Sequence, residues 1–245
     1  MPNNTCTAIV LRSAKYSEHD KMLTLFSLQD GKISVAAKGA QNTSCKYLAS
    51  AQLFCVSEFV LNEGKSIYVA SAEVINGFFG LNKKLACVCA ASYAAELTDK
   101  LYEEGVADEN AFRLLYFTLG MLEKAEEKNA VRIATAFALK LLGINGLYPM
   151  LDCCIECGET KNEYRLDYGN GGIVCRDCAA GSDIPLISAS EANYLRDLLY
   201  IDVTKLDSLP EAENIDQKYL FKLINNYIIY NTEKNVKSFD MLYSL

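Results

Sequence analysis

The chain has 245 residues, of which 51% are hydrophobic and 22% are charged, and its formal net charge is −7. With 14 Gly and 4 Pro, this composition excludes collagen, a disordered chain and a simple coiled coil, and it suffices for one large or two small domains. No apolar run reaches the roughly 18 residues that a membrane span needs, and the first residues do not resemble a signal peptide. We therefore expect a soluble protein of the cytoplasm.

Charge is distributed unevenly along the chain. Residues 1–80 carry a net charge of +1, residues 81–150 carry −1, and residues 151–245 carry −7. The overall acidity argues against a histone-like protein that coats DNA without specificity, because such proteins need a large positive charge. The sequence is still compatible with a local nucleic-acid site in the first third, since the acidic residues are concentrated in the last third.

Residues 5–80 have the pattern of short β-strands. Alternating or β-rich segments lie at 7–12, 21–28, 33–37, 52–61 and 66–74. Between the second and third segments, Asp30-Gly31 predicts a tight hairpin with a primed turn, because such turns need positive φ and glycine adopts it at little cost. Five strands without a helical pattern predict a small closed barrel, since closure leaves no exposed strand edge.

From residue 81 the hydrophobic period becomes helical. Apolar stripes at i, i+3, i+4 and i+7 spacing indicate helices after residues 84, 108, 129 and 188, and a last helix around 220–228. We expect Asp108 and Asn129 to cap helices, Gly143 to end one, and Ser188 with Glu191 to form a capping box. The predicted fold is α+β, with a barrel domain at 1–80 and a helical domain at 81–245. A segment at 151–183, rich in Cys, Gly and charge, is inserted in the helical domain.

Two C-x-x-C pairs lie in this inserted segment. They are Cys154 with Cys157 and Cys175 with Cys178, and seventeen residues separate the pairs. Each pair can direct two thiolates at one point, and two pairs complete the tetrahedral four-cysteine site that is typical of structural Zn²⁺. Residues 163–174 predict a β-hairpin that brings the pairs together. Because four thiolates leave no open coordination position, we expect one structural zinc ion per chain.

Other interpretations of the cysteines stay open at this point. Cys153 precedes the first pair and can compete with Cys154, although the C-x-x-C spacing favours Cys154. A metal-free cluster or a redox pair is the alternative to zinc, but the βαβ setting of a thioredoxin-type pair is absent from the pattern. Cys55, Cys87 and Cys89 lie inside apolar stretches and are expected to be buried as small hydrophobic residues.

The sequence carries no recognisable catalytic motif. It contains no phosphate-binding loop, no dinucleotide fingerprint, no H-E-x-x-H and no G-x-S-x-G. Its one histidine, His19, lies in the polar stretch between the first two predicted strands and is expected in a solvated turn. We therefore expect that this protein is not an enzyme.

The order of these pieces resembles the RecO family, the bacterial recombination mediators of DNA repair. Matching stretches are residues 8–12 with 16–25, 30–34 with 37–40, 137–143 with 146–149, and the two cysteine knuckles at 151–158 and 171–178. Lys237-Ser-Phe239 is similar to the closing motif of the family. The resemblance spans residues 5–242, and the knuckles are its most specific part.

The resemblance implies an N-terminal OB-fold, here a five-stranded barrel, and a helical domain that carries a zinc module. It implies binding to single-stranded and double-stranded DNA, annealing of complementary strands, and RecR as a partner. With RecR, such proteins load RecA onto strands coated by single-stranded DNA-binding protein (SSB), and many bind the acidic C-terminal tail of SSB. It also implies a place at the bacterial nucleoid.

An OB barrel binds DNA with cations against phosphates and aromatic rings against bases. The candidates in the barrel are Arg12, Lys15, Tyr16, Lys21, Lys38 and Lys46. Tyr68 can also stack, whereas Phe54 and Phe59 lie inside strands and are expected in the core. Where the family usually has more basic residues, this chain has Gln41–Cys45. We therefore expect weak, salt-sensitive DNA binding that RecR improves.

For the acidic SSB tail, the helical domain needs an apolar pocket edged by cations. The candidates are Arg132 and Lys140, eight residues apart on one predicted helix, with Phe137 on its apolar face. An alternative function is a zinc-stabilised adaptor that contacts other proteins and no DNA, which the acidic last third favours. A zinc enzyme is a second alternative, but it needs the open metal position that four thiolates do not leave.

Overall fold

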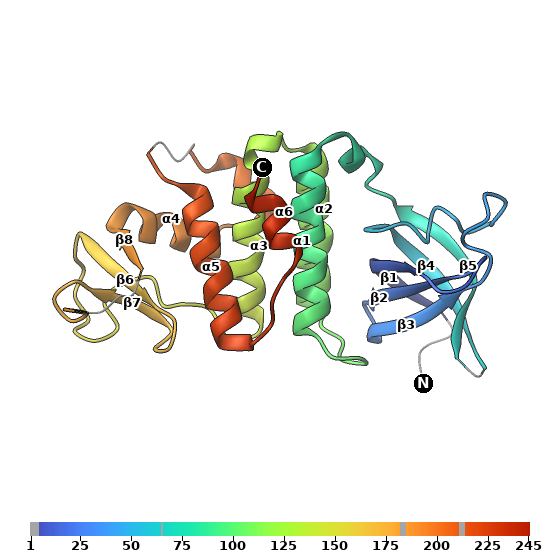
Figure 1. The fold of residues 1–245 in the computed structure, drawn as a ribbon, viewed down its shortest axis with the longest axis horizontal. Coiled ribbons are helices and arrows are strands. Elements are labelled where there is room, and N and C mark those ends of the chain that lie inside the picture. Colours follow the sequence, from blue (N-terminus) through green and yellow to red (C-terminus); the bar gives the residue numbers. More distant parts are fainter. Residues whose placement is uncertain (1–4, 65, 182–184, 211–213) are drawn as a thin grey trace.

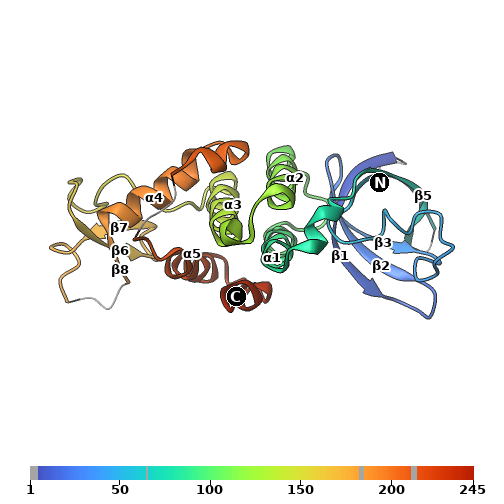
Figure 2. The same cartoon turned by 90° about the horizontal axis from the view of Figure 1, so that it is seen from above.

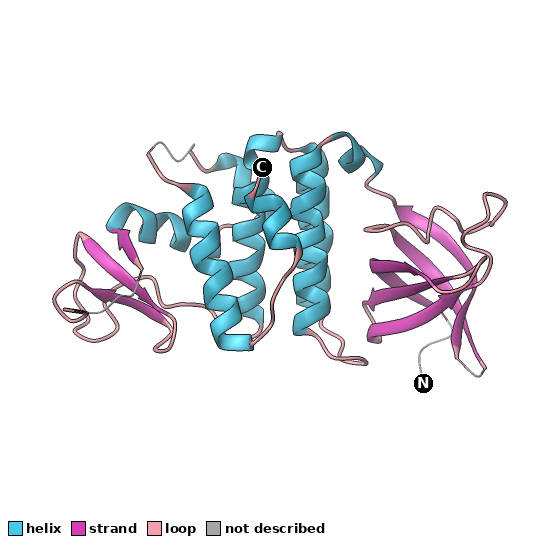
Figure 3. Cartoon of the chain, viewed as in Figure 1, coloured by secondary structure: helices cyan, strands magenta, loops and turns pink. Residues whose placement is uncertain are grey.

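The computed structural model describes residues 5–64, 66–181, 185–210 and 214–245. A β-barrel, a bundle of helices and a small β-sheet follow one another along the long axis of the molecule (Figure 1). The view from above shows the same order, with the barrel and the small sheet at opposite ends (Figure 2). Strands are thus confined to the two ends and helices lie between them (Figure 3). No described helix is both long and apolar enough to span a membrane.

The barrel is built from five strands, as the sequence predicts. They are β1 (Thr5–Lys15), β2 (Lys21–Ser27), β3 (Gly31–Ala37), β4 (Val56–Glu63) and β5 (Ile67–Asn76). Their spatial order is β1-β2-β3-β5-β4, and β4 pairs with β1 to close the barrel. The inner face buries an apolar core that includes Leu25, Val35 and Phe59, so the prediction that Phe59 is a core residue is confirmed.

Two local predictions in the barrel are wrong. Strand β4 begins at Val56 and not at Gln52, because Phe54 adopts a left-handed backbone with φ of 68° that a continuing strand does not tolerate. The Asp30-Gly31 hairpin forms, but three residues separate the paired Ser27 and Gly31. Positive φ is found at Gly31 and not at Asp30, so the connection is a three-residue loop rather than a two-residue primed turn.

The helices lie between residues 79 and 243. The long ones are α1 (Leu85–Leu101), α2 (Glu109–Lys124), α3 (Ala130–Ile144), α4 (Ala189–Tyr200) and α5 (Gln217–Thr232), and α6 (Ser238–Tyr243) is short. Short 3-10 helices are η1 (Phe79–Lys83), η2 (Glu127–Asn129) and η3 (Val203–Ser208). Helix α3 is central, because it packs against α1, α2, α4 and α5. The N-terminus of α6 is held by Glu96 of α1, whose carboxylate accepts from the backbone of Lys237 and Ser238.

The helix ends agree with the predicted caps in two of four cases. The Asp108 carboxylate accepts from two backbone N–H groups at the start of α2, and Ser188 with Glu191 forms the capping box of α4. Asn129 precedes α3 but makes no side-chain cap bond, because it ends the turn η2 with helical backbone angles. Gly143 does not end α3, which continues to Ile144.

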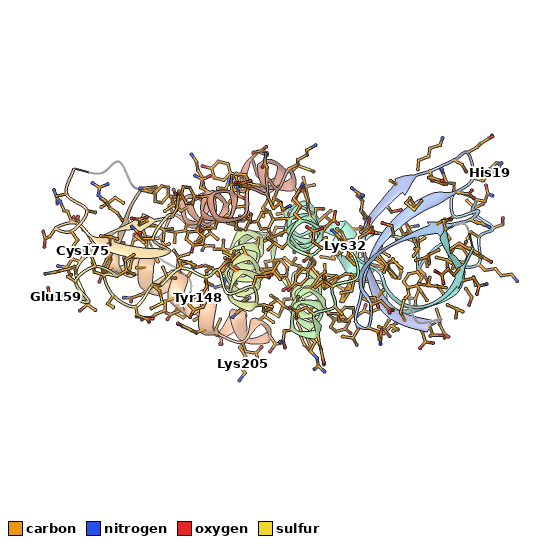
Figure 4. The ribbon with its side chains drawn as sticks, turned by 90° about the horizontal axis from the view of Figure 1, so that it is seen from below. His19, Lys32, Tyr148, Glu159, Cys175 and Lys205 are labelled. Atoms are coloured by element: carbon orange, nitrogen blue, oxygen red, sulfur yellow. The ribbon has the colours of Figure 1, made fainter. Side chains whose placement is uncertain are left out.

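The outer face of the barrel shares a core with the helices. The ring of Phe26 on β2 lies 5.1 Å from the ring of Tyr102 and 6.5 Å from that of Phe112, measured between centroids. Lys32 on β3 sits at this junction (Figure 4), with its Nζ 3.3 Å from a carboxylate oxygen of Asp99. The barrel is therefore a packed part of the molecule and not a freely tethered module.

The small sheet interrupts the helices after α3. It consists of β6 (Glu163–Asp167), β7 (Gly172–Cys175) and β8 (Leu186–Ser188), in the order β7-β6-β8. The predicted hairpin is β6 with β7. The sequence does not predict strand β8, which extends the sheet beyond residue 183, the expected end of the insertion. Residues 182–184 lie outside the described part of the chain.

Candidate metal centre and nucleic-acid interface

The structure brings the four predicted cysteines together at the end of the molecule that is farthest from the barrel (Figure 4). The sulfurs of Cys154, Cys157, Cys175 and Cys178 all lie within 4.8 Å of one another. The Cys157 and Cys175 sulfurs are 3.9 Å apart. A tetrahedron with Zn–S bonds of ~2.3 Å has sulfur–sulfur edges of roughly 3.8 Å, so this spacing fits a single metal ion.

Each knuckle directs its sulfurs through tight backbone turns. The Gly158 N–H donates to the Cys154 carbonyl at 2.8 Å, and Gly158 has a φ of 73° that suits glycine. The two knuckles also contact each other, since the Cys175 N–H donates to the Cys154 sulfur at 3.2 Å. Hairpin β6–β7 supplies the second knuckle, so the sheet itself positions the cluster.

The cysteine sulfurs of the cluster interact with one another and with nearby backbone N–H groups. Burial raises the pKa of the Cys154 thiol, but backbone N–H groups of Cys175, Cys157 and Glu156 outweigh burial and lower it to about 6. The neighbouring sulfurs of Cys175 and Cys157 raise the pKa of Cys178 to about 12. Four thiolates at this spacing repel one another, and only a bound cation makes the fully deprotonated set favourable.

The donor set is made of sulfur alone, which favours Zn²⁺ among common metals. Cys153 is partly exposed and does not belong to the cluster, so the preference for Cys154 agrees with the structure. Cys55, Cys87 and Cys89 are buried, as predicted from their apolar surroundings. The four cysteines are therefore a candidate metal centre.

Three of the predicted DNA-binding lysines meet at one end of the barrel. Lys15 on β1 lies directly opposite Lys21 on β2, and Lys21 lies opposite the last residue of β3, which precedes Lys38. Like charges directly opposite each other destabilise a sheet, so a nearby anion would relieve this pair. Arg12 is exposed and pairs with Thr24, which places it on the other face of the ladder.

The loop between β1 and β2 completes this end of the barrel and points away from the helices, as His19 shows (Figure 4). Tyr16 opens the loop with 65% of its surface exposed. The Asp20 carboxylate accepts from the Gly39 N–H at 2.8 Å, which ties the loop to the segment after β3. This bond, with one from the Ser17 hydroxyl, lowers the pKa of Asp20, so the carboxylate stays charged beside the lysines.

Lys38 and Lys46, at the two ends of the polar loop after β3, line one groove. The groove has a volume of about 320 Å³ and lies between the segment 38–47 and residues 70–72 of β5. The Tyr47 hydroxyl donates to the Lys38 carbonyl at 2.5 Å. The Lys38 ammonium lies 4.3 Å from the centroid of the Tyr68 ring, a cation–π contact.

The predicted SSB-tail residues do not form one open pocket. Phe137 is fully buried in the helical core, so its ring is not accessible to a ligand. The Lys140 ammonium donates to the carbonyls of Leu199 and Ile201, which end helix α4. Burial lowers the pKa of Lys140, and its cation has a structural role there. The helical periodicity of the sequence placed Phe137 and Lys140 on α3 correctly, but it gave no information about which other elements pack over them.

Arg132 lines a different cavity, which sequence reasoning missed. This cavity of about 290 Å³ lies where α2 ends and α3 begins, and its charged lining residues are Lys124, Glu126, Lys128 and Arg132. The Lys128 ammonium lies 3.5 Å from a carboxylate oxygen of Glu126. The Arg132 side chain is buried and donates to the Leu209 carbonyl at 3.5 Å. Lys124 ends α2, Lys128 lies in η2 and Arg132 lies in α3, so no helical periodicity in the sequence could have revealed the cavity.

Comparison with known proteins now decides the family. A family model described as "Recombination protein O N terminal" matches residues 1–78, and one described as "Recombination protein O C terminal" matches residues 84–240. The chain belongs to the RecO family. The first match covers the barrel, and the second covers the helices together with the four cysteines.

Curated relatives in the RecO family match over almost their whole length. A protein from Desulforamulus reducens is 35% identical, with 96% of this chain and 92% of the relative covered. One from Alkaliphilus metalliredigens is also 35% identical, with 92% of each covered. One from Caldanaerobacter subterraneus is 30% identical, with 97% and 96% covered. All three are named DNA repair protein RecO.

Proposed function

We propose that this chain acts in DNA repair and recombination as a mediator that binds single-stranded and double-stranded DNA through its barrel. The observation that carries the proposal is the gathering of Lys15, Lys21 and Lys38 at one end of a closed five-stranded barrel. Lys46 and the exposed Tyr16 extend this surface, and the exposed Arg12 adds positive charge on the other face of the β1–β2 ladder. Cations of this kind bind phosphates without regard to sequence, which is what a repair mediator requires.

The mediator brings complementary strands together and, with RecR, helps RecA to replace SSB on single strands. Membership of the RecO family supports this role. Annealing needs only that two strands be neutralised and held close, so it needs no catalytic group. The protein is therefore not an enzyme, and its zinc ion is structural, since four cysteine ligands leave no coordination position for a substrate.

The acidic C-terminal tail of SSB binds in the cavity at the start of α3. Three cations, Lys124, Lys128 and Arg132, line this cavity against one carboxylate, that of Glu126, so its charge is positive. The first N–H groups of α3 add the positive end of the helix dipole. A chain-terminal carboxylate with acidic neighbours is complementary to this arrangement. Lys140 and Phe137 contribute by holding α3 in place rather than by touching the tail.

A strand-annealing assay tests the proposal directly. The double substitution Lys38→Ala with Lys46→Ala should slow annealing and reduce DNA affinity at low salt, and the loss should shrink as salt rises. Lys205→Ala with Lys218→Ala removes the same charge from exposed positions of the helical domain and should leave annealing unchanged. Wild-type protein that neither binds nor anneals DNA would favour the alternative, a zinc-stabilised adaptor for other proteins.

The SSB-tail site has its own test. A fluorescent peptide with an acidic stretch and a free C-terminal carboxylate should bind the wild-type chain and lose affinity with Lys124→Ala plus Lys128→Ala. Both lysines are exposed, so folding should be retained. The Lys205→Ala, Lys218→Ala protein is the charge-matched control. Equal peptide affinity in all three proteins would exclude this cavity as the tail site.

A further inference from the structure

We infer that the groove between segment 38–47 and strand β5 is a pocket for one unpaired nucleotide of a DNA single strand. The inference rests on the proposed function and makes it more specific. The lysine pair Lys15 and Lys21 can contact the phosphates of any DNA, whereas the groove selects single strands.

The groove exists because the barrel closes between β3 and β5 through a very short ladder. Strands β3 and β5 pair at one position, Ala36 with Tyr68, and then diverge. A bulge in the β4–β5 ladder follows at once, between the pairs Val60–Ser71 and Leu61–Val69. Among the described residues, no strand pairs with residues 70–72 on the side of β3. This seam leaves a hollow whose floor is backbone and small side chains.

The size of the groove suits one nucleotide. Its volume of about 320 Å³ is at the small end of the roughly 300–1,000 Å³ of small-ligand sites. Its floor is made by Gly39, Ala70, Ser71 and Ala72, whose small side chains let a flat ring approach the backbone. Tyr47 adds an aromatic wall, and its ring is fixed because the hydroxyl donates to the Lys38 carbonyl.

The charge of the groove suits a phosphodiester on either side of that nucleotide. Lys38 and Lys46 both line it, and none of its described lining residues is acidic. The Lys38 ammonium is held 4.3 Å from the Tyr68 ring centroid, which fixes its charge beside the groove. Asn42 and Ser44 provide hydrogen-bonding groups for the edge of a base without restricting which base it is.

Duplex DNA cannot use such a pocket without losing a base pair. Its bases are stacked and paired, and extruding one costs a few kcal/mol. A single strand presents bases that are already unpaired, and stacking on protein aromatic rings favours them regardless of sequence. The groove therefore gives the barrel a preference for single strands that a purely cationic surface lacks.

Cys45 provides the test in the unmodified protein, because it lines the groove and is partly exposed. The rate of Cys45 alkylation is measured by mass spectrometry, with Cys153, which is also partly exposed, as the internal reference. A thymidine oligonucleotide at ten times its Kd should slow alkylation of Cys45 by about tenfold and leave Cys153 unchanged. A duplex of equal length, bound to the same extent, should protect Cys45 much less, because its bases stay paired and do not enter the groove, and should leave Cys153 unchanged.

A variant that fills the groove gives a second test. Cys45→Phe should lower the affinity for the thymidine oligonucleotide by about tenfold, the value of one stacked base, with a much smaller effect on the duplex. Asn82→Phe places the same ring at an exposed position outside the groove and should bind both DNAs as wild type does. Thermal unfolding confirms that each variant is folded, and if Cys45→Phe is not, the alkylation experiment decides.

The possible failures are distinct. Single-strand binding without protection of Cys45, equal protection by duplex, or equal protection of Cys153 would overturn the nucleotide pocket and leave DNA binding intact. Absence of any DNA binding by the wild-type protein would instead overturn the proposed function.

Discussion

The two β-structures at the ends of the molecule are stabilised by different means. The barrel closes on itself and encloses an apolar core in which Leu25, Val35 and Phe59 are fully buried. The small sheet has strands of five, four and three residues, and four cysteine sulfurs gather at its outer end. The small sheet also packs into the helical core, where Leu166, Ile173 and Ile187 are buried. At its outer end we expect a metal ion held by the four cysteines to provide the stability that such short strands lack.

Removal of one candidate metal ligand should have the largest effect on stability. The effect should be confined to the end of the molecule that carries the small sheet. Cys175→Ser deletes a buried ligand that is also part of β7. We expect loss of the metal and unfolding of residues 150–175, because structural zinc contributes on the order of 10 kcal/mol to such modules. Hydrogen exchange should become fast there and stay slow in β1–β5.

Cys153→Ser is the matched control, since Cys153 is outside the cluster. It should retain one zinc ion per chain and wild-type exchange rates. If Cys175→Ser also kept its metal and its slow exchange, the two β-structures would not differ in the way proposed.

A cavity in the barrel should destabilise the barrel end of the molecule and leave the metal centre at the other end intact. Phe59→Ala empties a fully buried site, and substitutions of this kind cost roughly 3–5 kcal/mol. We expect this decrease in the free energy of unfolding in urea, with the zinc content unchanged. Phe117→Ala, at a ring on α2 that is 41% exposed, should cost less than about 1 kcal/mol. Loss of zinc in Phe59→Ala would show that the two ends are coupled.

Features that depend on residues close together in the chain could be predicted from the sequence, and features that depend on distant residues could not. The cysteine spacing, the caps at Asp108 and Ser188, and the Asp30-Gly31 hairpin depend on residues close together in the chain, and all are present. The hydrogen bonds of Lys140 could not be predicted, because its partners, the carbonyls of Leu199 and Ile201, lie some sixty residues further along.

Two other features that the sequence did not predict also depend on contacts between distant segments. The left-handed backbone of Phe54 accompanies a hydrogen bond from its N–H to the Val10 carbonyl, a contact between distant segments. The groove that contains Lys38 and Lys46 depends on how far β5 diverges from β3, which no local pattern encodes. Local signals thus predicted the helices, strands and candidate metal ligands. Which residues surround each lysine could be seen only in the three-dimensional structure.

The junction between barrel and helices should be sensitive to a single methyl group. Gly31 and Gly39 have nearly the same backbone, with φ of 68° and 69°. A Cβ at Gly31 would lie 2.1 Å from the Val106 carbonyl oxygen, whereas a Cβ at Gly39 would meet nothing within 4 Å. Both substitutions to Ala cost roughly 1–2 kcal/mol for the left-handed backbone, and only Gly31→Ala adds the steric clash.

We therefore expect Gly31→Ala to be less stable than Gly39→Ala by about 1–3 kcal/mol in urea unfolding, the usual cost of overpacking. Equal stability of the two variants would mean that the barrel and the loop at Val106 separate easily, and that the barrel behaves as an independent module. In that case the barrel, like the small sheet, would be a separate unit attached to the helical bundle.

The smallest expected effects concern the caps of the helices that follow each junction. Asp108 caps α2 next to the barrel, and Ser188 caps α4 next to the small sheet. Replacement of either by Ala should cost about 0.5–2 kcal/mol. The cost should be greater at Asp108, because its carboxylate also accepts from the Tyr102 hydroxyl at 2.8 Å, and Tyr102 is buried.

Asn129→Ala is the control, because Asn129 precedes α3 without a side-chain cap bond and should change stability by less than about 0.5 kcal/mol. Urea unfolding ranks the three variants. If metal binding dominates the stability of the small sheet, Ser188→Ala should lower the free energy of unfolding less with zinc bound than after the zinc is chelated. In the zinc-loaded protein the metal also holds β8 and α4 in place through the sheet. An equal cost in both forms would place α4 with the helical bundle alone.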